Sequence, residues 1–302
     1  MSLRPSSDFD SKNLTMTLGG RWYGHYGAAP CPVCQPERRR DQNALNLADG
    51  QNGLLLHCKK SSCAFRDILA ALDLAFGRYR PPDPESLALR DSQRQADLVR
   101  RADQARTIWN EAQPIDRTPA EAYLRGRAIT CALPKTLRFH SAVWHGPSAR
   151  RFPAMISLVE GGNGFAIHRT YLRTDGAAKA DISPNKSMLG AVSGGAVRLS
   201  EGTGPLVVAE GIETSLSLTS GLVLETATVW AALSTSGMKA LHLPSQPQRL
   251  TIATDGDRAG REAGQVLAKR AFALGWEVMF LPAQDGKDWN DILRAKAGVT
   301  ST

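Results

Sequence analysis

Residues 250–260, Leu-Thr-Ile-Ala-Thr-Asp-Gly-Asp-Arg-Ala-Gly, decide the fold of the C-terminal third of this chain. The apolar run at 250–254 predicts a buried strand. The sequence Asp255-Gly-Asp257-Arg-Ala-Gly260 predicts a sharp turn into a helix over about residues 260–274. The stretch therefore predicts one strand-turn-helix unit with acids at the end of its strand.

The same order of apolar run and acid occurs twice more in this region. Glu210 follows the run Leu206–Ala209, and Asp288 follows the run at 277–281. The other predicted elements are a helix near 214–219, a strand at 228–233 and a last helix from about residue 290. Strands that alternate with helices predict the α/β class, with a parallel sheet flanked by helices over residues 204–302.

Four acids, Glu210, Asp255, Asp257 and Asp288, follow strands of this predicted sheet. The carboxyl ends of parallel strands meet at one edge, where open α/β sheets bind their ligands. Crowded carboxylates raise one another's pKa unless a cation neutralises them. Hard oxygen ligands with open positions favour Mg²⁺ or Mn²⁺ shared with substrate phosphates. The sequence therefore predicts a divalent-metal site made from these four side chains.

Four of the five cysteines form two close pairs near the N-terminus. Cys31-Pro-Val-Cys34 and Cys58-Lys-Lys-Ser-Ser-Cys63 are 23 residues apart. Two such knuckles can present four thiolates to zinc when they meet across a β-hairpin. The sequence predicts a zinc site at Cys31, Cys34, Cys58 and Cys63, with His57 as an alternative ligand to Cys58.

The segment between the knuckles predicts the hairpin itself, with strands at 44–47 and 54–57 around a turn at Asp49-Gly50. About 70 residues with few aromatics would fold poorly without help, so zinc would replace part of a hydrophobic core. Cys131 stands alone and is interpreted as structural.

Composition excludes several classes of protein. The 302 residues are 42% hydrophobic and 22% charged, which is ordinary for globular domains and enough for two or three of them. No apolar run approaches the ~20 residues that span a membrane, and the N-terminus lacks the apolar core of a signal peptide. We expect a cytoplasmic protein with reduced cysteines and no membrane partner.

Positive charge is concentrated in the middle of the chain, although the formal net charge is +8 overall. Residues 76–200 carry 19 Lys and Arg against 11 Asp and Glu, whereas residues 201–302 carry 9 against 11. A basic segment beside an acidic one predicts a polyanion held against a carboxylate site, with a solvated Arg-rich surface as the alternative.

The sequence between the cysteines and the sheet predicts a linker, helices and a few strands. Prolines at 77–84 predict the linker, and a helix over 85–113 should stop at Pro114. Thr118-Pro119 with Glu121 predicts a capped short helix. Strands are expected at 154–159, 165–172 and 196–199. The predicted domains are a zinc ribbon at 1–76, linker and long helix at 77–117, a small mixed α+β basic subdomain at 118–203, and the sheet at 204–302.

Three motifs resemble the Toprim signature, found in DnaG-type primases, topoisomerases, OLD-type nucleases and RecR-like repair proteins. They are Glu210-Gly-Ile-Glu213-Thr, Asp255-Gly-Asp257-Arg-Ala-Gly and Lys287-Asp288-Trp-Asn-Asp291. Residues 31–68 resemble the zinc ribbon of DnaG-type primases, with Cys34 where His often stands and two extra residues in the second knuckle. Residues 164–169 and 179–190 are similar to the basic half of a primase core. The whole resembles a primase of mobile-element or phage type.

The resemblance implies DNA replication chemistry, in which RNA primers are made on single-stranded DNA from nucleoside triphosphates. Glu210, Asp255, Asp257 and Asp288 would be the catalytic acids and would hold Mg²⁺ or Mn²⁺. Arg169, Lys179, Lys186 and Lys287 would steady triphosphate or template. The sequence contains no P-loop, which argues against an attached helicase motor. A separate replicative helicase is therefore the form in which such a partner would be expected. The alternatives are a Toprim metal-dependent nuclease and a non-catalytic DNA-binding repair or regulatory factor.

Overall fold

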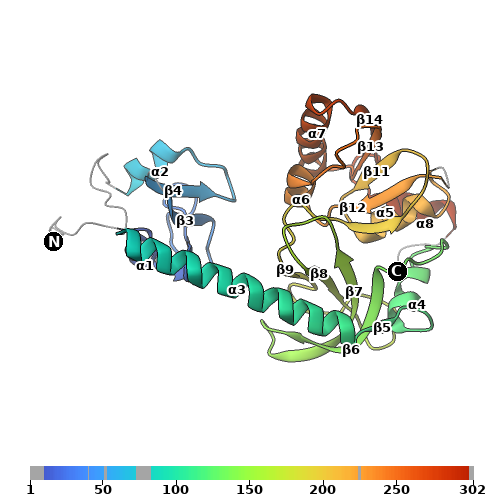
Figure 1. The fold of residues 1–302 in the computed structure, drawn as a ribbon, viewed down its shortest axis with the longest axis horizontal. Coiled ribbons are helices and arrows are strands. Elements are labelled where there is room, and N and C mark those ends of the chain that lie inside the picture. The colour runs from blue at the N-terminus through green and yellow to red at the C-terminus, as the bar shows by residue number, and fades with distance from the viewer. Residues whose placement is uncertain (1–9, 40, 51–52, 73–82, 224–225, 299–302) are drawn as a thin grey trace. The chain divides into compact units, whose positions relative to one another are not determined.

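The computed structural model describes residues 10–39, 41–50, 53–72, 83–223 and 226–298. The chain forms two compact units, Met1–Leu98 and Val99–Thr302, and α3 (Pro84–Glu111) contributes to both (Figure 1). The predicted long helix is confirmed and ends before Pro114. Most of the predicted linker at 77–84 lies outside the described residues. No described helix has the length and apolar composition needed to cross a bilayer.

The first unit contains a four-stranded antiparallel sheet in the order β1-β2-β3-β4. Its elements are α1 (Ser11–Thr17), β1 (Arg21–Trp22), β2 (Gly27–Ala29), β3 (Leu45–Gly50), β4 (Gly53–Cys58) and α2 (Phe65–Ala71). The core is small, and its buried members include Leu45, Leu47 and Ile68 together with Cys31 and Cys58. The thiols are therefore part of the only core this unit shows among its described residues.

The predicted hairpin is confirmed, but its turn is not where the sequence suggests. Asp49 and Gly50 belong to β3 and pair with Leu54 and Gly53, so these two residues are not the turn, and residues 51–52 lie outside the described part of the chain. The physical reason lies in the carboxylate of Asp49, which accepts from the hydroxyl of Ser11 at 2.7 Å and pairs with Arg90. These bonds fasten the end of β3 to α1 and α3.

An antiparallel sheet of five strands, in the order β5-β6-β7-β8-β9, begins the second unit. Its strands are Gln113–Pro114, Leu137–His145, Arg150–Val159, Ala166–Tyr171 and Lys186–Gly190. The predicted strands at 154–159 and 165–172 are confirmed as β7 and β8, but the sequence does not predict β6 or β9. The register of β6 shifts between His140 and Val143, which interrupts the alternation that marks a strand.

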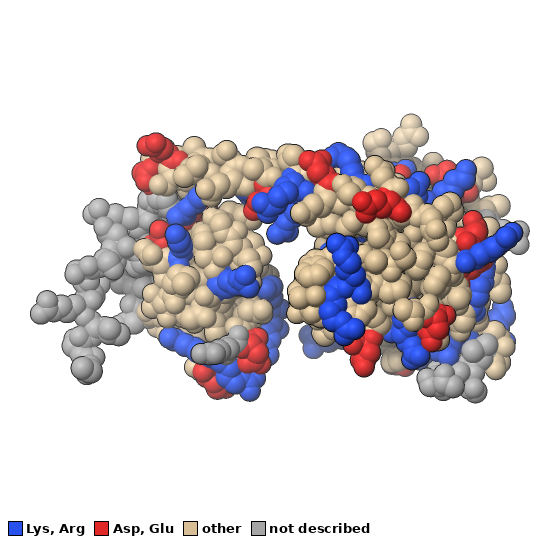
Figure 2. All heavy atoms as spheres, turned by 90° about the horizontal axis from the view of Figure 1, so that it is seen from below, with Lys and Arg blue, Asp and Glu red and all other residues tan. Residues whose placement is uncertain are grey.

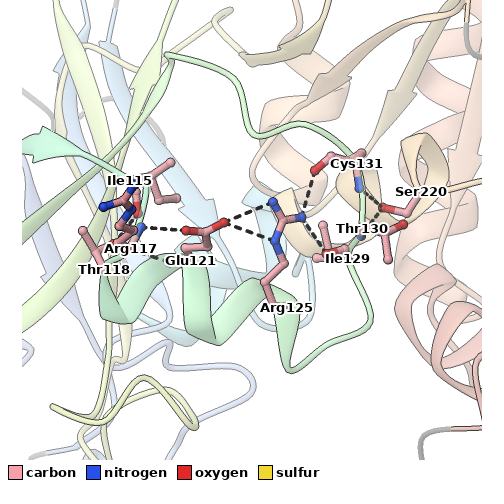
Figure 3. Close-up of polar contacts among 9 residues, drawn as sticks. All are labelled: Ile115, Arg117, Thr118, Glu121, Arg125, Ile129, Thr130, Cys131 and Ser220. Carbon is pink, nitrogen blue, oxygen red and sulfur yellow. Dashed lines mark hydrogen bonds and ion pairs between the residues drawn. The ribbon is translucent and has the colours of Figure 1, made fainter.

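The short helix α4 (Pro119–Arg125) begins with the predicted cap. Thr118 accepts from the backbone N–H of Glu121 at 3.5 Å, and Pro119 occupies the first turn. The reciprocal bond differs from the prediction, because the Glu121 carboxylate accepts from the N–H of Arg117 at 2.7 Å (Figure 3). The cap thus includes one residue more than a simple capping box.

Polar contacts connect the segment after α4 to Ser220, at the end of the helix Ile212–Thr219 (Figure 3). The guanidinium of Arg125 donates to the carbonyls of Ile129 and Cys131, each at 2.9 Å. The hydroxyl of Ser220 accepts from the backbone N–H groups of Thr130 and Cys131. Both backbone polar groups of Cys131 are thus hydrogen-bonded, as a structural role for this residue requires.

The C-terminal sheet has five strands in the order β10-β12-β11-β13-β14 (Figure 1). Its strands are β10 (Val197–Ser200), β11 (Leu206–Ala209), β12 (Thr228–Ala231), β13 (Arg249–Thr254) and β14 (Glu277–Pro282). Its helices are α5 (Ile212–Thr219), α6 (Thr235–Ala240), α7 (Arg258–Ala273) and α8 (Trp289–Lys296). Strands β11 to β14 are parallel, which confirms the predicted α/β class. β10 pairs antiparallel with β12, so the strand expected in the preceding subdomain belongs to this sheet.

Each face of this sheet is covered by helices. Val208 and Ile252 pack with Leu267 of α7 on one face, and Val207 and Ala253 pack with α5 and its surroundings on the other. From β11 the chain goes to β12 on one side and then to β13 on the other. This reversal is a topological switch point, the usual ligand site of an open α/β sheet.

Candidate active site

The predicted acids lie at the switch point of the parallel sheet. Glu210 directly follows β11, and Asp255 directly follows β13. The two strands are neighbours with Ala209 opposite Ala253, so both acids leave the same edge of the sheet. The structure therefore places them where the sequence predicts.

Asp257 and Asp288 each begin a helix at this edge. The carboxylate of Asp257 accepts from the N–H of Gly260 at 2.7 Å, and that of Asp288 accepts from the N–H of Asp291 at 2.8 Å. Asp291 returns the bond to Asp288 and completes a capping box. Each capping bond uses one carboxylate oxygen, so the caps fix the direction of both acids and leave the second oxygen for a ligand.

Gly256 holds the loop after β13 against the loop after β14. Its N–H donates to the carbonyl of Lys287 at 2.8 Å, and its carbonyl accepts from Gly286 at 3.0 Å. A Cβ on Gly256 would lie 1.8 Å from the carbonyl oxygen of Gln284, so only glycine permits this approach. The glycine between the two acids thus brings Asp288 to their side.

Replacing Gly256 with alanine should destabilise the second unit by about 1–3 kcal/mol, because backbone must move to admit the methyl group. Urea unfolding measures this change. Gly146→Ala is a matched control, since its Cβ would meet only Trp144 at 4.0 Å. Equal stability of the Gly256→Ala and Gly146→Ala proteins would contradict the assigned approach.

The acids at this edge act on one another electrostatically. Burial and then the charges of Asp288, Glu210 and Asp257 raise the pKa of Asp255 to about 7. Burial and then Asp257 raise the pKa of Glu210, while Lys186 opposes the rise. Repulsion of this kind is what a bound cation relieves.

The spacing of the acids fits an ion that keeps other ligands. Among the residues that the structure describes, only the four cysteines bring three or more ligand atoms within 4.8 Å of one another. The acids are therefore farther apart than a closed protein cage requires. Mg²⁺ suits such an open arrangement, because it keeps waters and takes few protein carboxylates plus phosphate oxygens.

Two of the predicted cations meet at a buried acid that the sequence does not assign to the site. The ammonium groups of Lys179 and Lys186 lie 3.2 and 3.0 Å from the two oxygens of Glu213. Glu213 is in the first turn of α5 and is 5% exposed. Glu213 belongs to the same Glu-Gly-Ile-Glu motif as Glu210, but its partners lie far back in the sequence.

Arg169 and Lys287 lie apart from these lysines. Successive side chains of β8 point to opposite faces, so Arg169 shares a face with Tyr171, whose ring is 5.9 Å from its guanidinium. Lys186 is opposite Thr170 and so belongs to the other face. Lys287 is exposed in the loop before Asp288. Lys and Arg are interspersed with Asp and Glu on the drawn face of each unit (Figure 2).

The four cysteines meet as predicted. Their sulfur atoms all lie within 4.8 Å of one another, and Cys34 Sγ is 3.6 Å from Cys58 Sγ. Tetrahedral zinc with Zn–S bonds of about 2.3 Å would require S···S distances of about 3.8 Å. Ser62 has a left-handed φ of 47°, which lets the longer second knuckle turn back to Cys63. His57 is not a member of this group among the described residues.

Aromatic side chains of the same unit gather in a way that sequence reasoning missed. The rings of Tyr23 and Tyr26 stack with centroids 5.1 Å apart, and the guanidinium of Arg21 is 5.5 Å from the ring of Tyr23. Tyr26 also lines a hollow of about 440 Å³ with His57 and Phe65. The interleaved sequence Arg-Trp-Tyr-Gly-His-Tyr at 21–26 was the available signal.

Comparisons with known proteins place families on both parts of the second unit. Residues 99–199 match a domain of unknown function (DUF7146), and residues 205–298 match the Toprim domain. The first match includes the antiparallel sheet, and the second includes the acids. No curated protein matches the chain.

Several solved structures are similar to the chain. A DNA primase domain from Pseudomonas aeruginosa is 20% identical, with a TM-score of 0.30 over 51% of this chain and 52% of that one. The Aquifex aeolicus primase (zinc-binding and RNA polymerase domains) is 13% identical, with a TM-score of 0.43 over 94% and 79%. The RNA polymerase domain of Mycobacterium tuberculosis primase DnaG is 19% identical, with a TM-score of 0.39 over 68% and 81%.

The chain spans about half, 52%, of the Pseudomonas aeruginosa structure. The Toprim match covers the four parallel strands whose switch point carries Glu210 and Asp255, as the sequence motifs predict. Residues 205–298 of this chain therefore match the Toprim domain in sequence and carry its parallel sheet.

Proposed function

We propose that this chain is a DNA primase that joins ribonucleotides into short RNA primers on single-stranded DNA. The observation that carries the proposal is the set of mutually repelling carboxylates at the Toprim switch point, with the ammonium of Lys186 acting on Glu210 from the neighbouring sheet. Nucleotidyl transfer needs both features, because side-chain cations and metal ions share the charge of the triphosphate.

The acids would divide the work of the reaction. Asp255, Asp257 and Asp288 would hold Mg²⁺ or Mn²⁺ together with the phosphates of the incoming nucleotide. Such ions supply charge neutralisation and a lowered pKa for the attacking 3′-hydroxyl. Glu210 would be a further ligand or would accept the hydroxyl proton, and its raised pKa suits the second role.

The cations would contact the substrates from different sides. Lys186 and Lys179, on the face toward Glu213, would steady the triphosphate. Lys287, exposed next to Asp288, would meet the same phosphates. Arg169 faces away from the lysines, so we assign it to the template rather than to the triphosphate.

Replacing Lys186 with alanine should lower nucleotide incorporation at least tenfold, about 1.4 kcal/mol of transition-state stabilisation. DNA affinity should fall only modestly, because one phosphate contact is one of several. Steady-state incorporation and DNA binding measure the two effects. Arg173→Ala is the control, since that exposed cation pairs with Asp175. Near-normal incorporation by Lys186→Ala would leave the chemistry to the acids alone.

The first unit would bind zinc and contact the template. Cys31, Cys34, Cys58 and Cys63 fit the metal, and stacked Tyr23 and Tyr26 beside Arg21 suit unstacked bases. We propose a zinc ribbon at 1–76, a linker and helix at 77–117, a basic subdomain at 118–203 and the Toprim domain at 204–302. β10 lies within residues 118–203 but is hydrogen-bonded to β12 of the Toprim sheet.

One experiment separates this function from its alternatives. Purified protein is incubated with circular single-stranded DNA, α-labelled ribonucleotides and Mg²⁺ or Mn²⁺, and the products are sized. Short labelled RNA supports a primase. Cutting of the circle without RNA supports a nuclease, and binding without either reaction supports a regulatory factor.

A further inference from the structure

The carboxylate of Glu213 has three partners from three separate segments. Its Oε1 accepts from the hydroxyl of Tyr123 at 2.8 Å and lies 3.2 Å from the ammonium of Lys179. Its Oε2 accepts from the ammonium of Lys186 at 3.0 Å. Tyr123 is on α4, Lys186 begins β9 and Lys179 is in the loop before it. One side chain of the Toprim domain thus joins three parts of the preceding subdomain.

The ion pairs are largely removed from water. The Glu213 side chain is 7% exposed, and those of Lys179 and Lys186 are 26% and 36% exposed. Burial alone would raise the pKa of Glu213, but Lys186 and Lys179 hold it well below its usual range. Burial and then Glu213 raise the pKa of Tyr123, so the phenol stays a proton donor. The carboxylate is therefore a fixed anion at neutral pH.

The neighbouring side chains of the antiparallel sheet cannot replace this anion. His168 is 4% exposed on the same sheet face, and burial followed by Lys186 lowers its pKa to about 4, so it is neutral. Ser157 is opposite His168, and Thr170 is opposite Lys186. Their hydroxyls are buried without hydrogen-bond partners in the described part of the chain. The sheet therefore offers the ammonium groups neutral neighbours, and Arg127 over Tyr123 adds a cation.

A lysine has four flexible bonds, and two ammonium groups at one site repel each other. Burial lowers the pKa of Lys179 most, and the charge of Lys186 lowers it further, while Glu213 raises it. A carboxylate between them offsets this repulsion and leaves the pair with one net positive charge. It also selects the side-chain conformations that keep Lys186 close enough to act on Glu210.

We infer that Glu213 is a positioning residue for the nucleotide site, holding Lys186 and Lys179 so that they meet the phosphates of a metal-bound nucleoside triphosphate. The inference rests on the proposed function. Glu213 itself touches neither phosphate nor metal in this account. It acts through the lysines, of which Lys186 acts electrostatically on Glu210.

Glu213→Gln tests this role, because the amide keeps the shape and loses the charge. We expect the KM for ribonucleotides to rise at least tenfold with a smaller change in kcat, since ground state and transition state lose the same contact. Trace acetylation with mass spectrometry should show Lys186 reacting at least threefold faster. Mg-ATP should protect Lys186 in the wild type and protect it less in the variant.

Glu277→Gln is the matched control, since that glutamate pairs with Arg249 on the surface and should behave as wild type. Glu213→Asp keeps the charge but cannot reach both ammonium groups, so intermediate KM and labelling are expected. It also serves if Glu213→Gln does not fold. Wild-type KM and wild-type labelling in a folded Glu213→Asp or Glu213→Gln protein would overturn the inference.

The two claims fail in different ways. If the wild type makes no RNA, the proposed function fails, while labelling and Mg-ATP protection of Lys186 still report on Glu213. If the wild type makes RNA and the variants label and bind Mg-ATP as it does, the function stands and the positioning role is wrong.

Discussion

Asp255→Asn should reduce nucleotide incorporation below detection while the protein stays folded. In the proposed function, the substitution would remove one anionic ligand from an open metal site in which few protein ligands share the ion. It also relieves repulsion, since burial and three neighbouring acids raise the pKa of Asp255 to about 7. Incorporation assays and thermal melting without metal measure the two effects. Asp257→Asn should lose activity in the same way.

The raised pKa of Asp255 also makes folding stability depend on pH in a definite direction. Asp255 binds its proton more tightly in the folded chain than in the unfolded chain, whose Asp pKa is about 3.9. Without metal, wild-type stability should therefore fall as pH rises from about 4 to 7, and Asp255→Asn should lack this part of the fall. The melting temperature of the variant should equal or exceed that of the wild type at pH 8.

The control for this prediction is Asp285→Asn, which changes a surface acid of the adjacent loop, 89% exposed and paired with Arg261. Its incorporation rate and melting temperature should match the wild type. Substantial turnover by Asp255→Asn would refute the assignment of this acid.

Cys31→Ser with Cys58→Ser should abolish zinc binding and unfold the first unit. These cysteines are 0% and 1% exposed and belong to its core, so their loss removes metal and packing together. Structural zinc contributes roughly 10–16 kcal/mol of apparent binding free energy, which few apolar side chains in a small unit can replace. Metal analysis should give one zinc per wild-type chain, and limited proteolysis should cut the variant within residues 10–72.

Cys131→Ser is the control for the zinc site, because Cys131 lies in the second unit, where its sulfur accepts from Thr219 at 3.2 Å. It should retain zinc in full. Zinc well below one per chain in the wild type, or zinc retained by the double variant, would show that the four ligands are wrong.

The sequence predicts the acid edge well because each part of it is local. An apolar strand, an acid at its end and a glycine before the next acid are neighbours in the chain, and parallel strands bring Glu210 and Asp255 to one edge. The two cysteine pairs can likewise be recognised from their local spacing alone. Such features need only periodicity and spacing to be recognised.

Contacts between distant segments are not predicted in the same way. Glu213 meets Lys186 across 27 residues and Tyr123 across 90, and nothing near Glu213 indicates those partners. Asp49 reads as a turn residue but is bound by Ser11 and Arg90, which lie 38 and 41 residues away. In each case tertiary contacts outweigh local preference.

Strand parity explains the separation of the predicted cations. Arg169 follows His168 directly, so closeness in sequence suggested one basic wall, but adjacent side chains of a strand point to opposite faces. Placing Arg169 correctly required the pairing of β8 with β9, and β9 is not evident from sequence. Its assignment to the template stays a prediction.

The most direct test of the central claim uses two labels on the same ribonucleotide. A primase begins a chain without a primer, so the first nucleotide keeps its triphosphate and every later one loses pyrophosphate. On circular single-stranded DNA with Mg²⁺ or Mn²⁺, α-label should enter every position of a short RNA, and γ-label should enter only its 5′ end. The account predicts both labels in one product that Asp255→Asn does not make. Products lacking γ-label, or no RNA from wild-type protein loaded with zinc, would contradict it.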